Sequence, residues 1–244
     1  MSQATGKIAF VRHGLSTHNG NAADPRNLPR FQSGYKPHLT PLGEEQARRV
    51  AEFLKAHEQD REILIVSSSF TRARKTTEII AERLFKAGRT IRHIIEDERL
   101  QERDVGELLD GKPIPRGITE REIDVLAIEK GGEPMQKVWE RITHFINTLK
   151  GGAIAYEGAL VIAVTHAFPI KAAVGIALGM DEKDAFQNIM IHNGSITTAE
   201  FGRGFFELMD SNMTAHLNGL PLHPLNGSQV TITANYGIAA KPEN

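Results

Sequence analysis

The sequence predicts an α/β fold in three layers, α/β/α, whose sheet is mainly parallel with one antiparallel strand. Short apolar runs rich in β-branched residues recur along the chain, and several have the composition of strands buried on both faces. Longer segments with apolar residues at three- and four-residue steps, typical of amphipathic helices, separate these runs. Because parallel strands need a connection of helix length, this alternation favours a parallel sheet covered by helices on both faces.

Six segments have the pattern of strands. The first four are the apolar runs 7–11, 63–66, 91–95 and 160–164. Late in the chain, the segments 195–201 and 205–209 flank Gly202-Arg203-Gly204, a pattern typical of a β-hairpin. A hairpin there supplies the antiparallel strand.

Four segments have helical spacing. The first runs from 41 to about 57, where Thr40 suits the N-cap and Pro41 the first turn. Further helices are expected at about 71–86, at about 134–150 and from near Pro169 onward. The segments 18–38, 103–132 and 210–244 show no convincing periodicity, and no element is predicted there.

Composition and charge narrow the class of protein. The 244 residues are 40% hydrophobic and contain no repeat or low-complexity tract, so we predict a single domain over residues 1–244. With 29 Lys and Arg against 30 Asp and Glu, the chain has no overall field for nucleic acid or an anionic membrane. The absence of cysteine excludes disulfide scaffolds, thiolate metal sites and cysteine nucleophiles. We find no secretion signal and no apolar stretch near the roughly 18 residues of a membrane span, and we expect a soluble cytoplasmic protein.

Two histidines follow two predicted strands at equivalent positions. Arg12-His13-Gly14 comes after the strand at 7–11, and Thr165-His166 comes after the strand at 160–164. In open α/β sheets the ligand lies beyond the carboxyl ends of the strands. We therefore expect the two imidazoles to meet across one crevice.

A third strand end adds a cation. The strand at 63–66 is followed by a run of hydroxyls and by Arg72, where a helix begins, and helix N-termini attract anions. Guanidinium groups match tetrahedral oxyanions in bidentate fashion. Together with backbone N–H groups that we expect to be exposed around Gly14, these side chains predict a phosphate pocket.

Five segments carry a wider pattern. They are Val11-Arg12-His13-Gly14-Leu15-Ser16-Thr17-His18-Asn19, the stretch 39–47, the stretch 67–76, Leu100-Gln101-Glu102-Arg103-Asp104-Val105-Gly106 and Val164-Thr165-His166-Ala167. In this order, from residue 7 to about 200, they resemble the histidine phosphatase superfamily, the group that contains cofactor-dependent phosphoglycerate mutases and many phosphomonoesterases. The resemblance implies a phosphoglycerate mutase-like fold.

The resemblance also implies a mechanism. His13 would be the nucleophile and form a phosphohistidine, which splits phosphoryl transfer into two steps. His166, Arg12 and Arg72 would bind the phosphoryl oxygens and stabilise the charge that they share in the transition state. Glu102 matches the acid position and would protonate the leaving alkoxide. No metal or cofactor is required.

Ser16 and Asn19 would add hydrogen bonds to substrate oxygens, although such side chains can equally satisfy backbone groups in a loop. Plainer roles exist for the others as well. The histidines can be solvated loop residues, and Arg72 can cap its helix or pair with Glu102. Acidic residues near Glu102, at 96–98 and at 107 and 110, are alternative acids.

The sequence departs from the family pattern at two places, and the second favours hydrolysis over mutase activity. Leu15 stands where the family usually carries Glu or Gln, which makes that side of the pocket drier. Between Glu102 and Glu133 there is no adjacent arginine pair of the kind that helps mutases grip a second phosphate. We therefore expect a phosphomonoester hydrolase, with a mutase and a non-catalytic phosphoryl-binding module as alternatives.

The partner that we expect is a small phosphorylated substrate, with neither nucleic acid nor a membrane, and a homo-oligomer is left open. Variable loops over a rigid sheet usually set specificity. The candidate contacts to the rest of the substrate are Arg26, Arg30, Lys36, Arg116 and Arg121.

Overall fold

A six-stranded mixed sheet forms the centre of the computed structural model, which describes residues 5–17, 19, 37–58, 61–106, 120–151 and 158–222. The strands lie in the order β3-β2-β4-β1-β5-β6. Their bounds are β1 (Gly6–Arg12), β2 (Ile63–Ser67), β3 (Ile91–Glu96), β4 (Leu160–Thr165), β5 (Ile196–Gly202) and β6 (Phe205–Met213). The strands β3, β2, β4 and β1 run parallel to one another, whereas β5 is antiparallel to both β1 and β6. The predicted mainly parallel sheet with a hairpin is confirmed.

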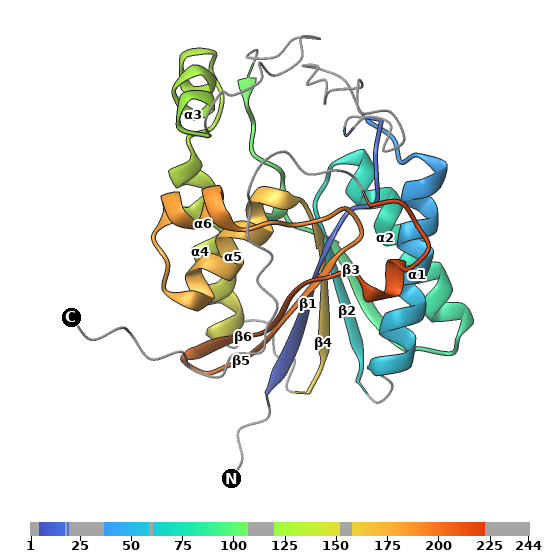
Figure 1. Cartoon of the computed structure of the whole chain (residues 1–244). Helices are drawn as coiled ribbons and strands as arrows, with labels where there is room; N and C mark the ends of the chain where they lie inside the picture. Colours follow the sequence, from blue (N-terminus) through green and yellow to red (C-terminus); the bar gives the residue numbers. More distant parts are fainter. Residues whose placement is uncertain are drawn as a thin grey trace, which may run out of the picture.

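Helices cover both faces of this sheet (Figure 1). The helices α1 (Pro41–His57) and α2 (Thr71–Lys86) lie on one face, and α4 (Met135–Lys150), α5 (Ala167–Leu178) and α6 (Glu182–Asn188) lie on the other. The predicted bounds of α1 and α2 are confirmed. The predicted three-layer α/β/α fold is confirmed as well.

The alternation along β1 explains why two cores form. Ile8 and Phe10 belong to the cluster under α4, α5 and α6, while Ala9 and Val11 belong to the cluster under α1 and α2. All four side chains are buried. Burial of a large apolar side chain stabilises the fold by about 1.5–3 kcal/mol, so a strand that is buried on both faces is held from both sides.

The start of α1 follows from its first residues. Thr40 Oγ1 accepts a hydrogen bond from the Gly43 N–H at 3.1 Å, and Pro41 occupies the first turn, where no backbone donor is needed. The helix α5 begins at Ala167, two residues before the predicted start. Pro169 then lies in the first turn, which tolerates the missing N–H.

The expectation of no element over 103–132 is wrong, because α3 (Glu120–Glu129) lies there. This helix is short and leaves Val125 and Ile128 about half exposed, so its apolar pattern is weak. Tertiary contacts hold it instead: Ala127 is fully buried, and Asp124 pairs with Arg103 at 2.5 Å. Propensity and periodicity do not report such contacts.

The end of β6 also differs from the prediction. The strand continues to Met213 rather than stopping at 209, through shifts of register against β5 between Ile196 and Ala199. Asn212 has a φ of 53° and donates its N–H to Thr197 Oγ1 at 3.0 Å. This irregular pairing breaks the period of two from which strands are recognised.

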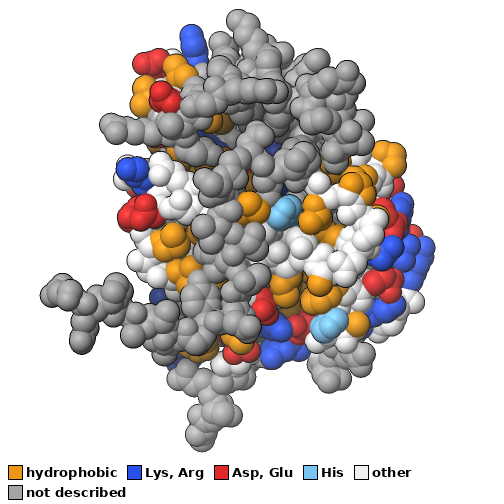
Figure 2. All heavy atoms as spheres, viewed as in Figure 1, with side chains coloured by type: hydrophobic (Ala, Val, Ile, Leu, Met, Phe, Trp, Pro, Cys, Tyr) orange, Lys and Arg blue, Asp and Glu red, His pale blue; other side chains and the backbone are white. Residues whose placement is uncertain are grey.

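The outer surface carries charges of both signs. Figure 2 shows Lys, Arg, Asp and Glu side chains interspersed over α1 and α2, at the right of the view. Within the residues that the structure describes, no helix is long and apolar enough to cross a membrane.

Candidate active site

The ends of β1 and β4 bring the two predicted histidines together. The strands pair in parallel with Arg12 opposite Thr165, and His13 and His166 are the next residues in each strand direction. The His13 N–H donates to the Thr165 carbonyl at 2.9 Å, which continues the register by one step. The two imidazole centroids lie 4.9 Å apart with the rings edge to face. The predicted meeting of the two rings is confirmed.

The hydrogen bonds of His13 determine which ring nitrogen carries the proton. Its Nδ1 lies 2.7 Å from the Gly14 carbonyl, which can only accept, so Nδ1 is the protonated atom. Nε2 lies 3.0 Å from Nε of Arg72, a donor, so Nε2 holds a lone pair. The two contacts agree on a neutral ring that is protonated on Nδ1 and carries a lone pair on Nε2.

Two buried guanidinium groups stand beside these rings. Burial lowers the pKa of both Arg12 and Arg72 to about 10. The charge of Glu102 opposes both shifts, and the charge of Arg12 adds slightly to the lowering at Arg72. Both side chains therefore remain cationic at neutral pH. Arg12 donates from Nη1 to the Ile191 carbonyl at 2.6 Å, and its buried Nε has no partner among the described residues. A buried charge is costly unless it is paired, so an anion in this site would offset a large desolvation cost.

His166 is the most deeply buried ring of the site. Its Nε2 lies 2.8 Å from Ser68 Oγ, and its Nδ1 is buried with no partner in the described part of the chain. Burial, followed by the positive charge of Arg72, lowers the pKa of His166 well below the ordinary value. His166 is neutral at physiological pH.

The carboxylate of Glu102, the predicted acid, lies against the first backbone N–H groups of α5. It accepts the N–H groups of Ala167 at 3.2 Å, Phe168 at 3.1 Å and Arg103 at 3.1 Å. Ala167 directly follows His166, so these bonds fix the carboxyl group beside the second histidine. The segment is anchored from β4 as well, because Thr165 Oγ1 donates to the Leu100 carbonyl at 2.6 Å.

The two predicted substrate contacts at 16 and 19 bind each other. Ser16 is fully buried and donates from Oγ to Oδ1 of Asn19 at 2.8 Å, and its N–H donates to the same oxygen at 3.2 Å. The hydroxyl of Ser16 is therefore engaged within the loop. Contacts of either residue to substrate remain a prediction.

The expectation that backbone N–H groups are exposed around Gly14 is wrong. The Gly14 N–H donates to Thr76 Oγ1 at 3.2 Å, and the Leu15 N–H donates to Gln46 Oε1 at 2.8 Å. A buried donor left without a partner costs about 1–3 kcal/mol, and side chains of α2 and α1 supply the acceptors. Side chains, rather than this stretch of backbone, are left to bind an anion.

Comparison with known proteins decides the family. A model of the histidine phosphatase superfamily (branch 1) matches residues 8–214. The chain belongs to this superfamily. The uncharacterized phosphatase PhoE of Bacillus subtilis is 30% identical over 218 residues, which cover 87% of this chain and 97% of that protein.

The superfamily members similar to this chain include both phosphatases and mutases. A 2,3-bisphosphoglycerate-dependent phosphoglycerate mutase of Methylorubrum populi is 30% identical over 189 residues, covering 72% of this chain and 81% of that protein. The crystal structure of phosphoglycerate mutase from Bacillus anthracis has a TM-score of 0.67 and 16% identity, and the match covers 88% of this chain and 96% of that one. The structural match supports the predicted phosphoglycerate mutase-like fold.

Sequence reasoning missed Asn193, which contacts the candidate site next to His13. Its buried Nδ2 donates to the His13 carbonyl at 3.1 Å and to Asn19 Oδ1 at 3.3 Å. The residue lies just before β5. Because β5 is antiparallel, its beginning reaches the edge at which the parallel strands end, and that topology was the available signal.

The candidate contacts to the rest of the substrate are not placed by the structure. Arg26, Arg30, Lys36 and Arg116 lie outside the described residues, as does the side chain of Arg121.

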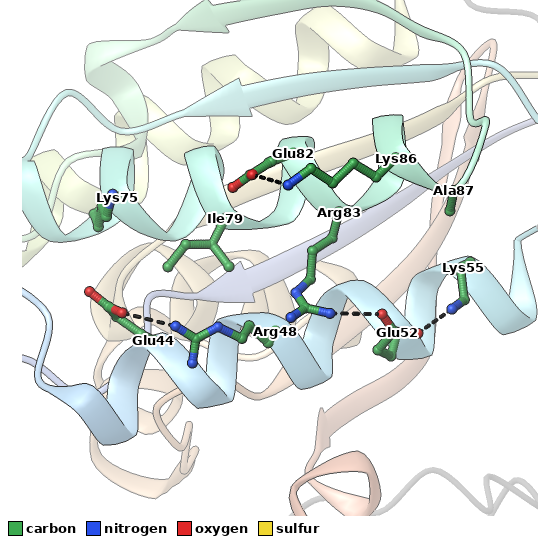
Figure 3. A pocket seen from close by; sticks show the side chains of 10 residues that line it. All are labelled: Glu44, Arg48, Glu52, Lys55, Lys75, Ile79, Glu82, Arg83, Lys86 and Ala87. Atoms are coloured by element: carbon green, nitrogen blue, oxygen red, sulfur yellow. Dashed lines mark hydrogen bonds and ion pairs between the residues drawn. The ribbon is translucent and has the colours of Figure 1, made fainter.

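A separate hollow of about 530 Å³ lies between α1 and α2, on the outer side of the helical layer (Figure 3). Its charged side chains pair with one another, as in Arg48 with Glu44 at 3.0 Å and Arg83 with Glu52 at 3.2 Å. None of its lining residues is among the predicted site residues. The candidate active site is the cluster of imidazoles and guanidinium groups at the carboxyl edge of the sheet.

Proposed function

We propose that this superfamily member is a phosphomonoester hydrolase that acts on a small phosphorylated substrate without a metal ion, through a phosphohistidine on His13. The observation that carries the proposal is the state of His13, whose Nδ1 is held by a carbonyl while Nε2 offers a lone pair beside Arg72. A neutral imidazole can attack phosphorus through the lone pair of its unprotonated nitrogen. The buried cations Arg12 and Arg72 and the neutral ring of His166 supply donors for the phosphoryl oxygens.

The first step transfers the phosphoryl group to the enzyme. Nε2 of His13 forms a bond to phosphorus while the bond from phosphorus to the ester oxygen breaks. Glu102, in its carboxylic acid form, gives its proton to the leaving alkoxide, which departs as an alcohol. Arg12 and Arg72 stabilise the charge on the equatorial oxygens.

The second step returns the enzyme to its starting state. Water attacks phosphorus, the carboxylate of Glu102 takes a proton from that water, and the bond between phosphorus and Nε2 breaks. The products are inorganic phosphate and neutral His13. The protons taken and given by Glu102 balance over the cycle.

The structural partners of Arg103 favour hydrolysis over mutase transfer. A mutase has to hold a bisphosphorylated intermediate, which requires cations beyond the core pocket. Arg103 is buried and engaged elsewhere, with Asp124 at 2.5 Å and with the Glu133 carbonyl at 2.9 Å. This cation is therefore committed to holding α3 and the start of α4.

The test is a screen for phosphate release in the presence of a chelator. Sugar phosphates, phosphoglycerates, nucleotides and phosphopeptides are offered with EDTA, and the enzyme is quenched during turnover to trap an acid-labile phosphoenzyme. We expect release and trapping with the wild type and neither with His13→Ala. Full activity of His13→Ala would overturn the proposal.

Two other outcomes separate the alternatives. Isomerised phosphoglycerate that depends on added bisphosphate, with little phosphate release, would indicate a mutase. Tight binding of phosphate without turnover of any ester would indicate a binding module. His93→Ala is the matched control, because His93 is exposed on β3, and it should retain wild-type activity.

A further inference from the structure

Ser68 links the end of β2 to the second histidine. The residue is fully buried, and its N–H donates to the Val164 carbonyl at 2.9 Å, which fixes it against the end of β4. Its Oγ lies 2.8 Å from His166 Nε2 and accepts the Phe70 N–H at 3.3 Å. Ser68 therefore contacts the ring from the side of Nε2.

The hydroxyl group of Ser68 has one acceptor to which it can donate its proton. A serine hydroxyl carries one O–H donor and two acceptor lone pairs, and one of these lone pairs already takes the Phe70 N–H. Within the described residues, the acceptor within reach of the O–H is Nε2 of His166. If Nε2–H donated instead, the buried O–H would be left without a partner, which costs about 1–3 kcal/mol.

The direction of this bond determines the other nitrogen. When Nε2 accepts, a neutral imidazole must carry its proton on Nδ1. Nδ1 is the buried atom for which the described residues supply no partner. The lowered pKa of His166, which burial causes with a smaller effect of the Arg72 charge, agrees with a ring that has a single proton.

We propose that Ser68 is a positioning residue that holds His166 in the Nδ1–H tautomer, so that the ring offers an N–H donor to a phosphoryl oxygen. In the opposite tautomer Nδ1 would present a lone pair, which repels the same oxygen. The role toward phosphate rests on the proposed function. The tautomer is a property of the resting protein and is tested without substrate.

The test reads the tautomer directly by nuclear magnetic resonance. Long-range correlation of the ring protons with both ring nitrogens in ¹⁵N-labelled protein distinguishes Nδ1–H from Nε2–H, and His166→Gln assigns the signals. We expect Nδ1–H in the wild type and a substantial population of Nε2–H in Ser68→Ala. Ser68→Thr retains a hydroxyl and should restore the wild-type pattern.

Ser67→Ala is the matched control. Ser67 is buried at the neighbouring position, and its Oγ donates to the Ser68 carbonyl and accepts from Thr77 Oγ1, both at 2.9 Å. Its described hydrogen bonds do not include His166. This variant loses a buried hydroxyl but should keep the Nδ1–H signals. Nε2–H in the wild type, or an unchanged tautomer in Ser68→Ala, overturns the proposal. The wild-type spectrum decides the first point even if Ser68→Ala fails to fold.

Binding and turnover show what the tautomer does. With inorganic phosphate as the probe, we expect affinity to fall about tenfold in Ser68→Ala, the size of one lost hydrogen bond, and to recover in Ser68→Thr. Unchanged phosphate affinity in a Ser68→Ala protein whose tautomer has changed would overturn the positioning role. Failure of the proposed function looks different, because then either the wild type releases no phosphate or His13→Ala releases as much as the wild type, whatever the tautomer of His166.

Discussion

Arg72 donates a hydrogen bond from Nε to Nε2 of His13 over 3.0 Å. The acceptor is the lone pair that the proposed nucleophile uses, so the resting site keeps that atom occupied. A phosphoryl group that enters must draw the Arg72 donors onto its own oxygens before Nε2 can attack. The contact therefore couples binding of the anion to release of the nucleophile.

Arg72→Lys tests this coupling. Lysine keeps a positive charge but loses the planar set of donors that can bond an imidazole and a phosphoryl oxygen. We expect kcat/KM for a phosphate ester to fall about 100-fold or more, the usual loss when a transition-state donor is removed. Arg74→Lys is the control on the same helix, since Arg74 pairs with Glu96 at the surface, and its initial rates should match the wild type. A wild-type rate in Arg72→Lys would contradict the coupling.

Glu102→Gln tests the acid. An amide keeps the size of the side chain but cannot give a proton to the leaving group. With alkyl phosphates we expect kcat to fall by roughly 10²–10⁴, and with aryl phosphates, whose leaving groups need no proton, we expect a much smaller loss.

Glu98→Gln is the control for this assignment, because Glu98 is an exposed carboxylate four residues earlier. It should leave both substrate classes unaffected. Equal losses for alkyl and aryl esters in Glu102→Gln would remove Glu102 from the acid role, and a selective loss in Glu98→Gln would move the role there.

The approach of His13 to His166 was predictable because it needs only two facts that the sequence carries. The apolar pattern shows where each strand ends, and the carboxyl ends of parallel strands lie at the same edge of the sheet. The same reasoning places Arg72 there, since α2 follows β2 directly. These predictions concern neighbours of strand ends, and they are independent of side-chain packing.

Other features of the site depend on contacts between distant segments and left no local pattern. Gln46 and Thr76 take up the backbone donors of residues 14 and 15 only because α1 and α2 pack against that loop. Asn193 reaches His13 only because β5 runs antiparallel to its neighbour. A periodicity of 2 or 3.6 residues contains no information about either contact.

Gly43→Ala tests the close packing of α1 against the loop that carries residues 14 and 15. In helix interiors alanine is favoured over glycine by about 1 kcal/mol, so propensity alone predicts a more stable α1. A Cβ at Gly43 would lie 2.0 Å from the Leu15 carbonyl oxygen, a backbone atom that cannot move aside cheaply. We expect the cost of the clash to exceed the gain in helix propensity, so that the free energy of unfolding falls by about 1–3 kcal/mol.

Urea denaturation measures this change, and phosphatase activity should fall with it because the displaced loop carries His13. Gly151→Ala is the control, since its Cβ would meet the Asn147 carbonyl oxygen at 3.2 Å at the end of α4. It should cost much less. A Gly43→Ala protein more stable than the wild type would show that the loop yields to the extra methyl group.

The buried state of His166 predicts how stability depends on pH. Its pKa is lowered well below 6.5 in the folded protein, chiefly by burial, so between these two values the unfolded chain binds a proton that the native protein does not. Unfolding then takes up a proton, and stability falls as the pH drops below about 6.5, with a limiting slope of about 1.4 kcal/mol per pH unit. Above pH 6.5 the ring of His166 is neutral in both the folded and the unfolded protein, so its contribution to stability no longer changes with pH.

Urea denaturation at pH 7.5 and 5.5 measures this effect. The loss of stability between the two pH values should be smaller in His166→Gln than in the wild type, by roughly 1 kcal/mol. His93→Gln, with an exposed ring, should lose as much as the wild type, and equal losses in all three proteins would mean that His166 takes up its proton in the native state.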